Sequence, residues 1–185
     1  MSPQFKVIVF IVASVGFAWV SRFSLRSFRF HGFYRFFAWV AIVALVLLNV
    51  DHWFHEPFSI HQIGSWILLI ISVSMVIHGA LLLRIAGKPD SRRRDPSLVS
   101  IEKTTRLVTV GAYRYIRHPI YSSGLYGVWG VFFKHPSWVG ISLAVLATLF
   151  LTMTARAEEA ENIRFFGAEY QGYMNRTKMF VPFLF

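Results

Sequence analysis

The sequence predicts an all-α polytopic membrane protein with about five transmembrane helices, the last of which extends into the cytosol. Composition, long apolar stretches and the placement of Lys and Arg support this prediction. Of the 185 residues, 55% are hydrophobic and only 15% are charged, and the mean hydropathy is +0.51. This balance is typical of a chain that crosses a bilayer several times. The chain contains no cysteine, which excludes disulfides, a thiolate nucleophile and cysteine-ligated metals.

Five apolar stretches are candidate membrane helices. They cover about residues 5–20, 36–50, 63–83, 120–133 and 138–154. Lys6 precedes the first stretch, as a basic residue would precede the core of a signal peptide. No small-residue cleavage site follows, so we interpret this stretch as a retained span.

The fourth stretch is short. Fourteen residues cover about 21 Å as an α-helix, less than the ~30 Å hydrocarbon core. Pro119 suits the first turn of a helix. We therefore expect this helix to begin below the headgroups, with His118 at its start beside a cavity inside the membrane surface. Gly124, Gly127 and Gly130 predict a smooth stripe that another helix can approach closely.

The fifth stretch is predicted to continue as a helix beyond the membrane. Residues 141–166 include no Gly or Pro, and Gly167 follows where a helix C-cap is expected. The cytosolic end of this helix carries the paired carboxylates Glu158 and Glu159. The apolar tail over residues 179–185 is expected to fold back onto the membrane surface, and residues 87–96 are expected to form a solvated loop.

The basic residues predict the orientation. Seventeen of the nineteen Lys and Arg residues lie within 21–35, within 84–118 or after residue 155, and only Lys6 and Lys134 lie elsewhere. The positive-inside rule then places the N-terminus outside and the C-terminus in the cytosol. The net charge of +10 is explained by topology and attraction to anionic headgroups. Nucleic-acid binding is disfavoured because no motif for it is present.

A polar island precedes the fourth span. Six Tyr, Arg and His side chains lie within residues 113–121. An interfacial belt of aromatic and arginine residues is one interpretation, and a binding site is the other. An arginine here could hold a carboxylate bidentately, and tyrosines could stack on a flat ring or a cation. Glu158 and Glu159 could be ordinary solvated residues, but spans four and five must be antiparallel neighbours, which brings the pair towards His118.

Other histidines have simpler interpretations. His52 and His55 have a spacing that could bind a metal on a helix, but a wetted interfacial loop is the better interpretation, and we assign no metal site. His78 lies within the third span and is expected to be a hydrogen-bonded packing residue.

Three motifs together resemble a known family. They are Gly-x-Tyr-x-x-x-Arg-His-Pro-x-Tyr at 111–121, Glu-Glu at 158–159 and Phe-Gly-x-Glu-Tyr-x-x-Tyr at 166–173. The combination resembles the isoprenylcysteine carboxyl methyltransferases, which belong with the phosphatidylethanolamine N-methyltransferases. These are integral-membrane enzymes that use S-adenosyl-L-methionine. The resemblance covers roughly residues 105–185, so we divide the chain into an N-terminal three-span region, 1–104, and a cofactor-binding and catalytic region, 105–185.

The resemblance implies a cofactor site and a lipophilic acceptor. By this resemblance, the positions that contact S-adenosylmethionine are Leu107, Val108, Tyr113, His118, Pro119, Tyr121 and Glu158. The sequence lacks a Gly-x-Gly-x-x-Gly strand–helix unit, which excludes a soluble Rossmann-type site. The acceptor is expected to be a prenylcysteine-like carboxylate or another lipid, entering sideways from the membrane.

Catalytic roles are assigned to Arg117, Arg156 and Glu159. The family commonly has an arginine four residues before the first glutamate, where it binds the substrate carboxylate. Thr154 occupies that position here, and Arg156 is the nearest arginine. A carboxylate acceptor needs no base, whereas an amine or hydroxyl would need one, and His118 or Glu159 could serve.

Two other functions remain open from the sequence. One is an NADPH-dependent membrane reductase, because the C-terminal region of sterol reductases resembles the same motif. The other is a non-enzymatic lipid-binding or transport protein that would bind neither cofactor. The expected location is a bacterial-type inner membrane, and the sequence does not indicate the oligomeric state.

Overall fold

The computed structural model describes residues 1–88 and 104–184, and all regular elements in these ranges are helices. The five apolar helices are α1 (Pro3–Ser21), α2 (His31–Asn49), α3 (Ile60–Ile85), α4 (Pro119–Phe132) and α5 (Trp138–Phe166). Each covers one of the five predicted stretches, and α2 begins at His31, about five residues earlier than predicted. The shorter elements are η1 (Ser24–Arg26), η2 (Val50–His52), η4 (Gly111–Arg114) and α6 (Ala168–Met174). The predicted loop at 87–96 lies outside the described residues beyond Lys88.

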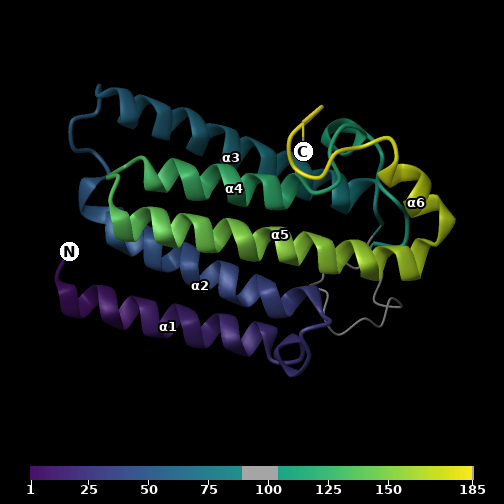
Figure 1. Ribbon diagram of the computed structural model, residues 1–185, viewed down its shortest axis with the longest axis horizontal. Helices are drawn as coiled ribbons and strands as arrows, with labels where there is room; N and C mark the ends of the chain where they lie inside the picture. Colours follow the sequence, from purple (N-terminus) through teal and green to yellow (C-terminus); the bar gives the residue numbers. More distant parts are fainter. Residues whose placement is uncertain (89–103, 185) are drawn as a thin grey trace.

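The five apolar helices run side by side with alternating direction, and the main pairs are α2 with α5 and α3 with α4 (Figure 1). Helix α1 lies at the edge of the bundle against α2. Both pairs join the predicted N-terminal region to the C-terminal one. Small buried residues bring α2 and α5 together, namely Ala38, Ala41, Ala144 and Ala147.

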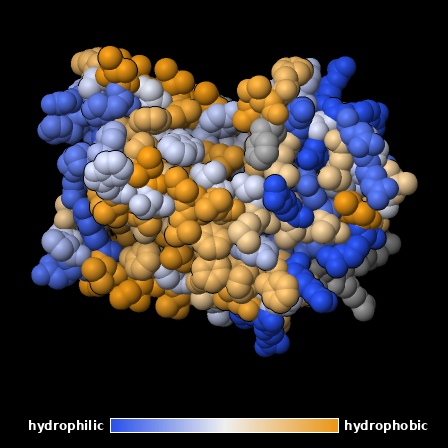
Figure 2. Space-filling view, viewed as in Figure 1, coloured by the Kyte–Doolittle hydropathy of each residue, from blue (hydrophilic) through white to orange (hydrophobic). Residues whose placement is uncertain are grey.

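The bundle has the surface of a membrane protein. Among the described residues, four helical segments are long and apolar enough to cross a bilayer: α1, residues 31–52, α3 and α5. Large apolar side chains on α1 and α3 are exposed, including Val12 and Ile70, and apolar residues cover the middle of the molecule (Figure 2). Helix α4 has only 14 residues, as predicted, and is therefore too short to cross alone.

The predicted glycine stripe of α4 packs closely against α3 at Gly127 and Gly130, whereas Gly124 faces Leu151 of α5. A Cβ on Gly130 would lie 2.9 Å from Cγ of Leu69, and a Cβ on Gly127 would lie 3.0 Å from Oγ of Ser72, so α3 approaches closely. Two serine hydroxyls of α3 strengthen this contact. Ser65 donates to the carbonyl of Gly130, and Ser72 donates to that of Ser123, both at 2.7 Å. Such small, hydrogen-bonded interfaces hold helices together where lipid surrounds them.

The helix ends follow the local sequence. Pro119 opens α4, and the backbone of His118 precedes it as the N-cap. Helix α5 ends at Phe166, and Gly167 follows with a φ of +61°, a conformation that favours glycine. The loops at residues 22–30, residues 104–118 and the tail lie at one end of the bundle, and the N-terminus lies at the other (Figure 1). Which end faces the cytosol remains a prediction.

Candidate functional site

The site begins with the loop that leads into α4. Gly111 has a φ of +60°, and a Cβ there would lie 2.6 Å from Cδ1 of Leu82 and 2.8 Å from Nε2 of His78. The loop therefore rests directly on α3. The backbone N–H of Ala112 donates to Nε2 of His78 at 3.4 Å, which confirms that His78 is a hydrogen-bonded packing residue.

The C-terminal tail forms part of the site. Ile116 and Lys178 form a parallel bridge, in which the N–H of Arg117 donates to the carbonyl of Lys178 at 2.8 Å. The N–H of Lys178 in turn donates to the carbonyl of Tyr115 at 3.0 Å. Phe180, only 1% exposed, is buried against the bundle. The expectation that the whole tail lies on the membrane surface is therefore wrong for its first part.

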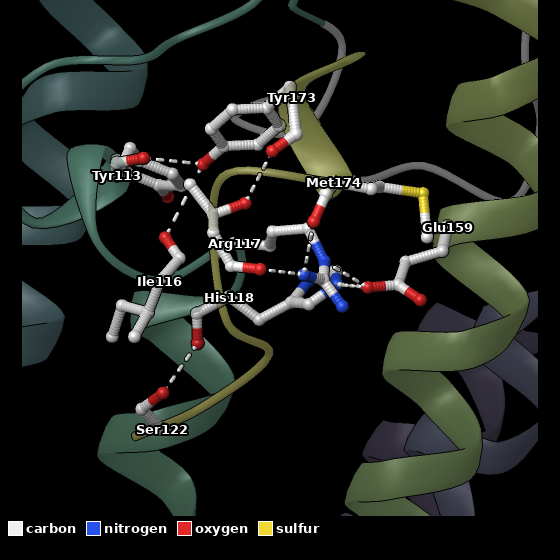
Figure 3. A network of polar contacts seen from close by, with 9 residues as sticks. Tyr113, Ile116, Arg117, His118, Ser122, Glu159, Tyr173 and Met174 are labelled. Carbon is white, nitrogen blue, oxygen red and sulfur yellow. Dashed lines mark hydrogen bonds and ion pairs between the residues drawn. The ribbon is translucent and has the colours of Figure 1, made fainter. Parts of the chain in front are cut away.

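Arg117 connects three segments of the site (Figure 3). Its Nε donates to Oε1 of Glu159 on α5 at 2.6 Å. Its Nη1 donates to the carbonyl of Met174 at 3.3 Å and also to that of Thr177. The guanidinium is largely buried, and these protein groups satisfy much of its hydrogen-bonding capacity.

His118 shares the same carboxylate. Its Nε2 lies 3.2 Å from Oε1 of Glu159, and its ring stacks on Tyr121 with centroids 5.5 Å apart. A carboxylate only accepts hydrogen bonds, so this contact favours the tautomer with the proton on Nε2. The other ring nitrogen, Nδ1, then carries a lone pair, and it forms no hydrogen bond with residues 1–88 or 104–184.

Two buried tyrosines of α6, Tyr170 and Tyr173, cover one side of the site. The hydroxyl of Tyr173 donates to the carbonyl of Tyr113 at 2.6 Å and to that of Ile116 at 3.4 Å. Burial raises the pKa of Tyr173 well above its usual value, and the charge of Arg117 opposes this only in part. Burial, together with the negative charge of Glu158, also raises the pKa of Tyr170. Both phenols therefore stay neutral donors at physiological pH.

These elements enclose a cavity with about 610 Å³ of empty space, part of it open to solvent. Of the predicted cofactor positions, Leu107, Val108, Tyr113, His118, Tyr121 and Glu158 line it. Pro119 is buried at the start of α4 and is not part of the lining.

The predicted catalytic residues occupy three different places. Arg117 lines the cavity, and Glu159 lies behind the wall, where it holds Arg117 and His118. Arg156 is exposed and is not part of the lining. Thr154 is fully buried, and its hydroxyl donates to the carbonyl of Phe150 within α5.

Sequence reasoning did not assign several lining residues. Asn162 and Phe166 follow Glu158 on the same face of α5, and α6 adds Tyr170 and Tyr173. The spacing of four residues from 158 to 166 was a usable signal, because such residues share a helix face. The α6 tyrosines come into place only through the turn at Gly167.

A second buried polar pair was also missed. Oε1 of Glu161 accepts from the backbone N–H of His31 at 3.0 Å, and Oε2 lies 2.7 Å from Nδ1 of the same residue. Glu161 thus accepts a hydrogen bond from the first turn of α2. The N-cap residue, Phe30, cannot do this because its side chain has no acceptor atom. The pair fixes α2 against the polar end of α5.

Comparison with known proteins finds a family match over the same part of the chain. Residues 94–169 match the model of a family described as phospholipid methyltransferase. The match includes Arg117, His118, Glu158 and Glu159 and confirms the resemblance to this group of membrane methyltransferases. No curated protein matches the chain.

Proposed function

We propose that this chain transfers a methyl group from S-adenosylmethionine to a lipophilic acceptor, at the membrane face where the cavity opens. The cavity carries the proposal. Its wall combines the half-buried carboxylate of Glu158 with the rings of Tyr113 and Tyr121, inside the segment that matches phospholipid methyltransferases.

The residues present suit the cofactor. S-adenosylmethionine supplies a methyl group that its sulfonium already activates. A carboxylate and tyrosine rings attract a cation, so Glu158, Tyr113 and Tyr121 would hold the charged part. Leu107 and Val108 add apolar wall, and the cover formed by α6 limits the access of water.

His118 would accept a proton from an amine or hydroxyl acceptor. Glu159 orients the ring through Nε2, which leaves Nδ1 to take the proton as the acceptor is alkylated. A carboxylate acceptor would instead need a cation. Arg117, the one arginine among the described lining residues, is already engaged by Glu159 and by two backbone carbonyls. This favours a lipid amine or hydroxyl over a free carboxylate.

A second hollow fits the lipophilic part of the acceptor. It has about 520 Å³ of empty space between α2, α3 and α4, part of it open to the surroundings, and its mainly apolar lining includes Leu45, Val76 and Val128. Gly124 of α4 lines this hollow and lies one helical turn beyond Tyr121 of the first cavity. A hydrocarbon chain in the hollow would thus place its head near the first cavity.

The test is methyl transfer in proteoliposomes. Labelled S-adenosylmethionine is supplied with phosphatidylethanolamine, a prenylcysteine or a long-chain alcohol, and lipid-soluble label is counted. The proposal expects transfer to at least one acceptor, a loss of about 10²-fold or more in His118→Gln, and normal rates in Tyr115→Phe. The absence of any transfer, combined with oxidation of NADPH by the same sample, would instead favour a reductase.

A further inference from the structure

A separate basic hollow lies beside the cover of the cofactor cavity. It is formed by η4 and by the segment after α6, and its lining includes Arg114, Arg176, Thr109 and Thr177. It encloses about 1020 Å³, open to solvent. A smaller hollow continues from the same two arginines to Lys178 and Phe183. Three cationic side chains therefore line two neighbouring hollows, and Arg114 and Arg176 line both.

These cations have no anionic partner in the part of the chain that the structure describes. The guanidinium of Arg114 lies 6.0 Å from the ring of Tyr115, and Nε of Arg176 donates to the carbonyl of Gly172 at 3.2 Å. Neither arginine, nor Lys178, forms an ion pair within residues 1–88 and 104–184. Like charges gathered in this way repel one another, and an anion placed between them would relieve the repulsion.

Exposed apolar side chains border the same hollow. Val110 lines the larger hollow, and Phe183, which is 82% exposed, lines the smaller one. Leu184, the next residue in the chain, is 78% exposed. Polar and apolar side chains are interleaved over this end of the molecule (Figure 2). Cations next to exposed apolar groups are typical of a surface that lies among lipid headgroups.

We propose that Arg114, Arg176 and Lys178 bind the phosphate of an anionic phospholipid, whose acyl chains lie in the bilayer beside Phe183 and Leu184. Arginine suits phosphate because its guanidinium can donate two parallel hydrogen bonds. The exposed apolar border favours a lipid over a free phosphate ester. This site goes beyond methyl transfer, because it requires neither the cofactor nor the acceptor.

The bound lipid would also stabilise the cover of the cofactor cavity. Arg114 belongs to η4, and Arg176 follows α6. The Tyr173–Tyr113 hydrogen bond already joins these two segments, and Tyr173 lines both cavities. A phosphate held by both arginines adds a second connection between them. Lipid binding should therefore raise the melting temperature of the protein in detergent.

Calorimetric titration of the detergent-purified chain tests the site. The probes are short-chain phosphatidylglycerol, short-chain phosphatidylcholine and glycerol phosphate. We expect saturable binding of phosphatidylglycerol, at least about tenfold weaker binding of the other two, and a rise in melting temperature with phosphatidylglycerol alone. Equal binding of glycerol phosphate would assign the site to a free phosphate ester and overturn the lipid proposal.

Matched variants separate this site from general charge attraction. Arg114→Gln/Arg176→Gln should weaken phosphatidylglycerol binding at least about tenfold, because two charge-assisted contacts are lost. Arg22→Gln/Arg26→Gln removes the same charge from exposed positions at the same end of the bundle and should leave binding unchanged. Equal weakening in both would contradict the proposal. If the double variant folds poorly, Arg176→Gln alone replaces it, because this change removes only one side-chain hydrogen bond. Its binding of phosphatidylglycerol is then compared with that of the wild type.

Discussion

Arg117 and Glu159 are joined by a 2.6 Å hydrogen bond between Nε and Oε1, which ties the loop before α4 to the polar end of α5. The same guanidinium holds the carbonyls of Met174 and Thr177, and the same carboxylate oxygen holds His118. One ion pair thus holds together three parts of the site: the loop before α4, the polar end of α5 and the segment from Met174 to Thr177.

Arg117→Ala should strongly destabilise the protein. The variant leaves the Glu159 carboxylate buried with His118 as its remaining partner among the described residues, and it frees the carbonyls of Met174 and Thr177. Removing one member of a buried pair costs about 3–5 kcal/mol. Unfolding in detergent measures the loss, and Arg106→Ala, at an exposed position, serves as the control.

The double variant Arg117→Ala/Glu159→Ala gives a sharper test of the pair. Because the second substitution removes the charge that the first left unpaired, the double variant should lose less stability than the two single variants together. Additive losses would show that the two side chains do not act as a pair.

Gly130→Ala should push α3 and α4 apart locally and lower the melting temperature. The added Cβ would lie 2.9 Å from Cγ of Leu69 and 3.2 Å from its backbone nitrogen, and backbone cannot move aside cheaply. Overpacking of this kind costs about 1–3 kcal/mol. Gly64→Ala, on the partner helix, meets no atom within 4 Å and should be neutral or slightly stabilising. Equal melting temperatures for the two variants would argue against the close contact.

Tyr173 gives a prediction for alkaline pH. Its pKa is raised from 10.0 on folding, mainly by burial. The neutral hydroxyl therefore stabilises the cover below pH 10, and this contribution falls as the pH rises further. Unfolding at pH 8 and pH 11 should show a larger loss of stability with pH for the wild type than for Tyr173→Phe. An identical loss for both proteins would contradict a buried phenol.

The absorbance of tyrosinate provides an independent check on Tyr173. In the folded protein at pH 11, Tyr173→Phe and the wild type should absorb equally at the tyrosinate band, because Tyr173 stays protonated. In denaturant the wild type should absorb more, because the phenol then ionises near its ordinary pKa.

Much of the fold could be predicted because membrane helices are encoded locally. The apolar stretches gave five helices, and the ends of α4 and α5 follow from Pro119 and Gly167. The glycine stripe indicated where another helix approaches α4: Gly127 and Gly130 face α3, whereas Gly124 faces Leu151 of α5. Each of these signals lies within a few residues of the feature it determines.

The parts that could not be predicted depend on contacts between distant residues. The bond from His31 to Glu161 spans 130 positions, and Tyr173 reaches Tyr113 across 60. The burial of Phe180 follows from the pairing of Lys178 with Ile116, and an apolar tail by itself does not indicate it. No local periodicity encodes such pairings.

The position of Arg156 could have been derived from helix geometry. Residues two apart on a helix lie about 200° apart around its axis, so Arg156 and Glu158 face in nearly opposite directions. Glu158 lines the cavity, and Arg156 is exposed, as this geometry requires. Nearness in sequence to the family's arginine position was therefore a weak argument for a site residue.

Calorimetric titration with S-adenosylmethionine tests the central claim most directly. The wild type should bind it in the micromolar range, and Glu158→Gln at least about tenfold more weakly, since a carboxylate facing a cation is lost. Glu169→Gln, which removes an exposed carboxylate of α6, should bind as the wild type does. If the folded wild type fails to bind S-adenosylmethionine, or if both variants bind as tightly as it does, the proposed cofactor site is contradicted.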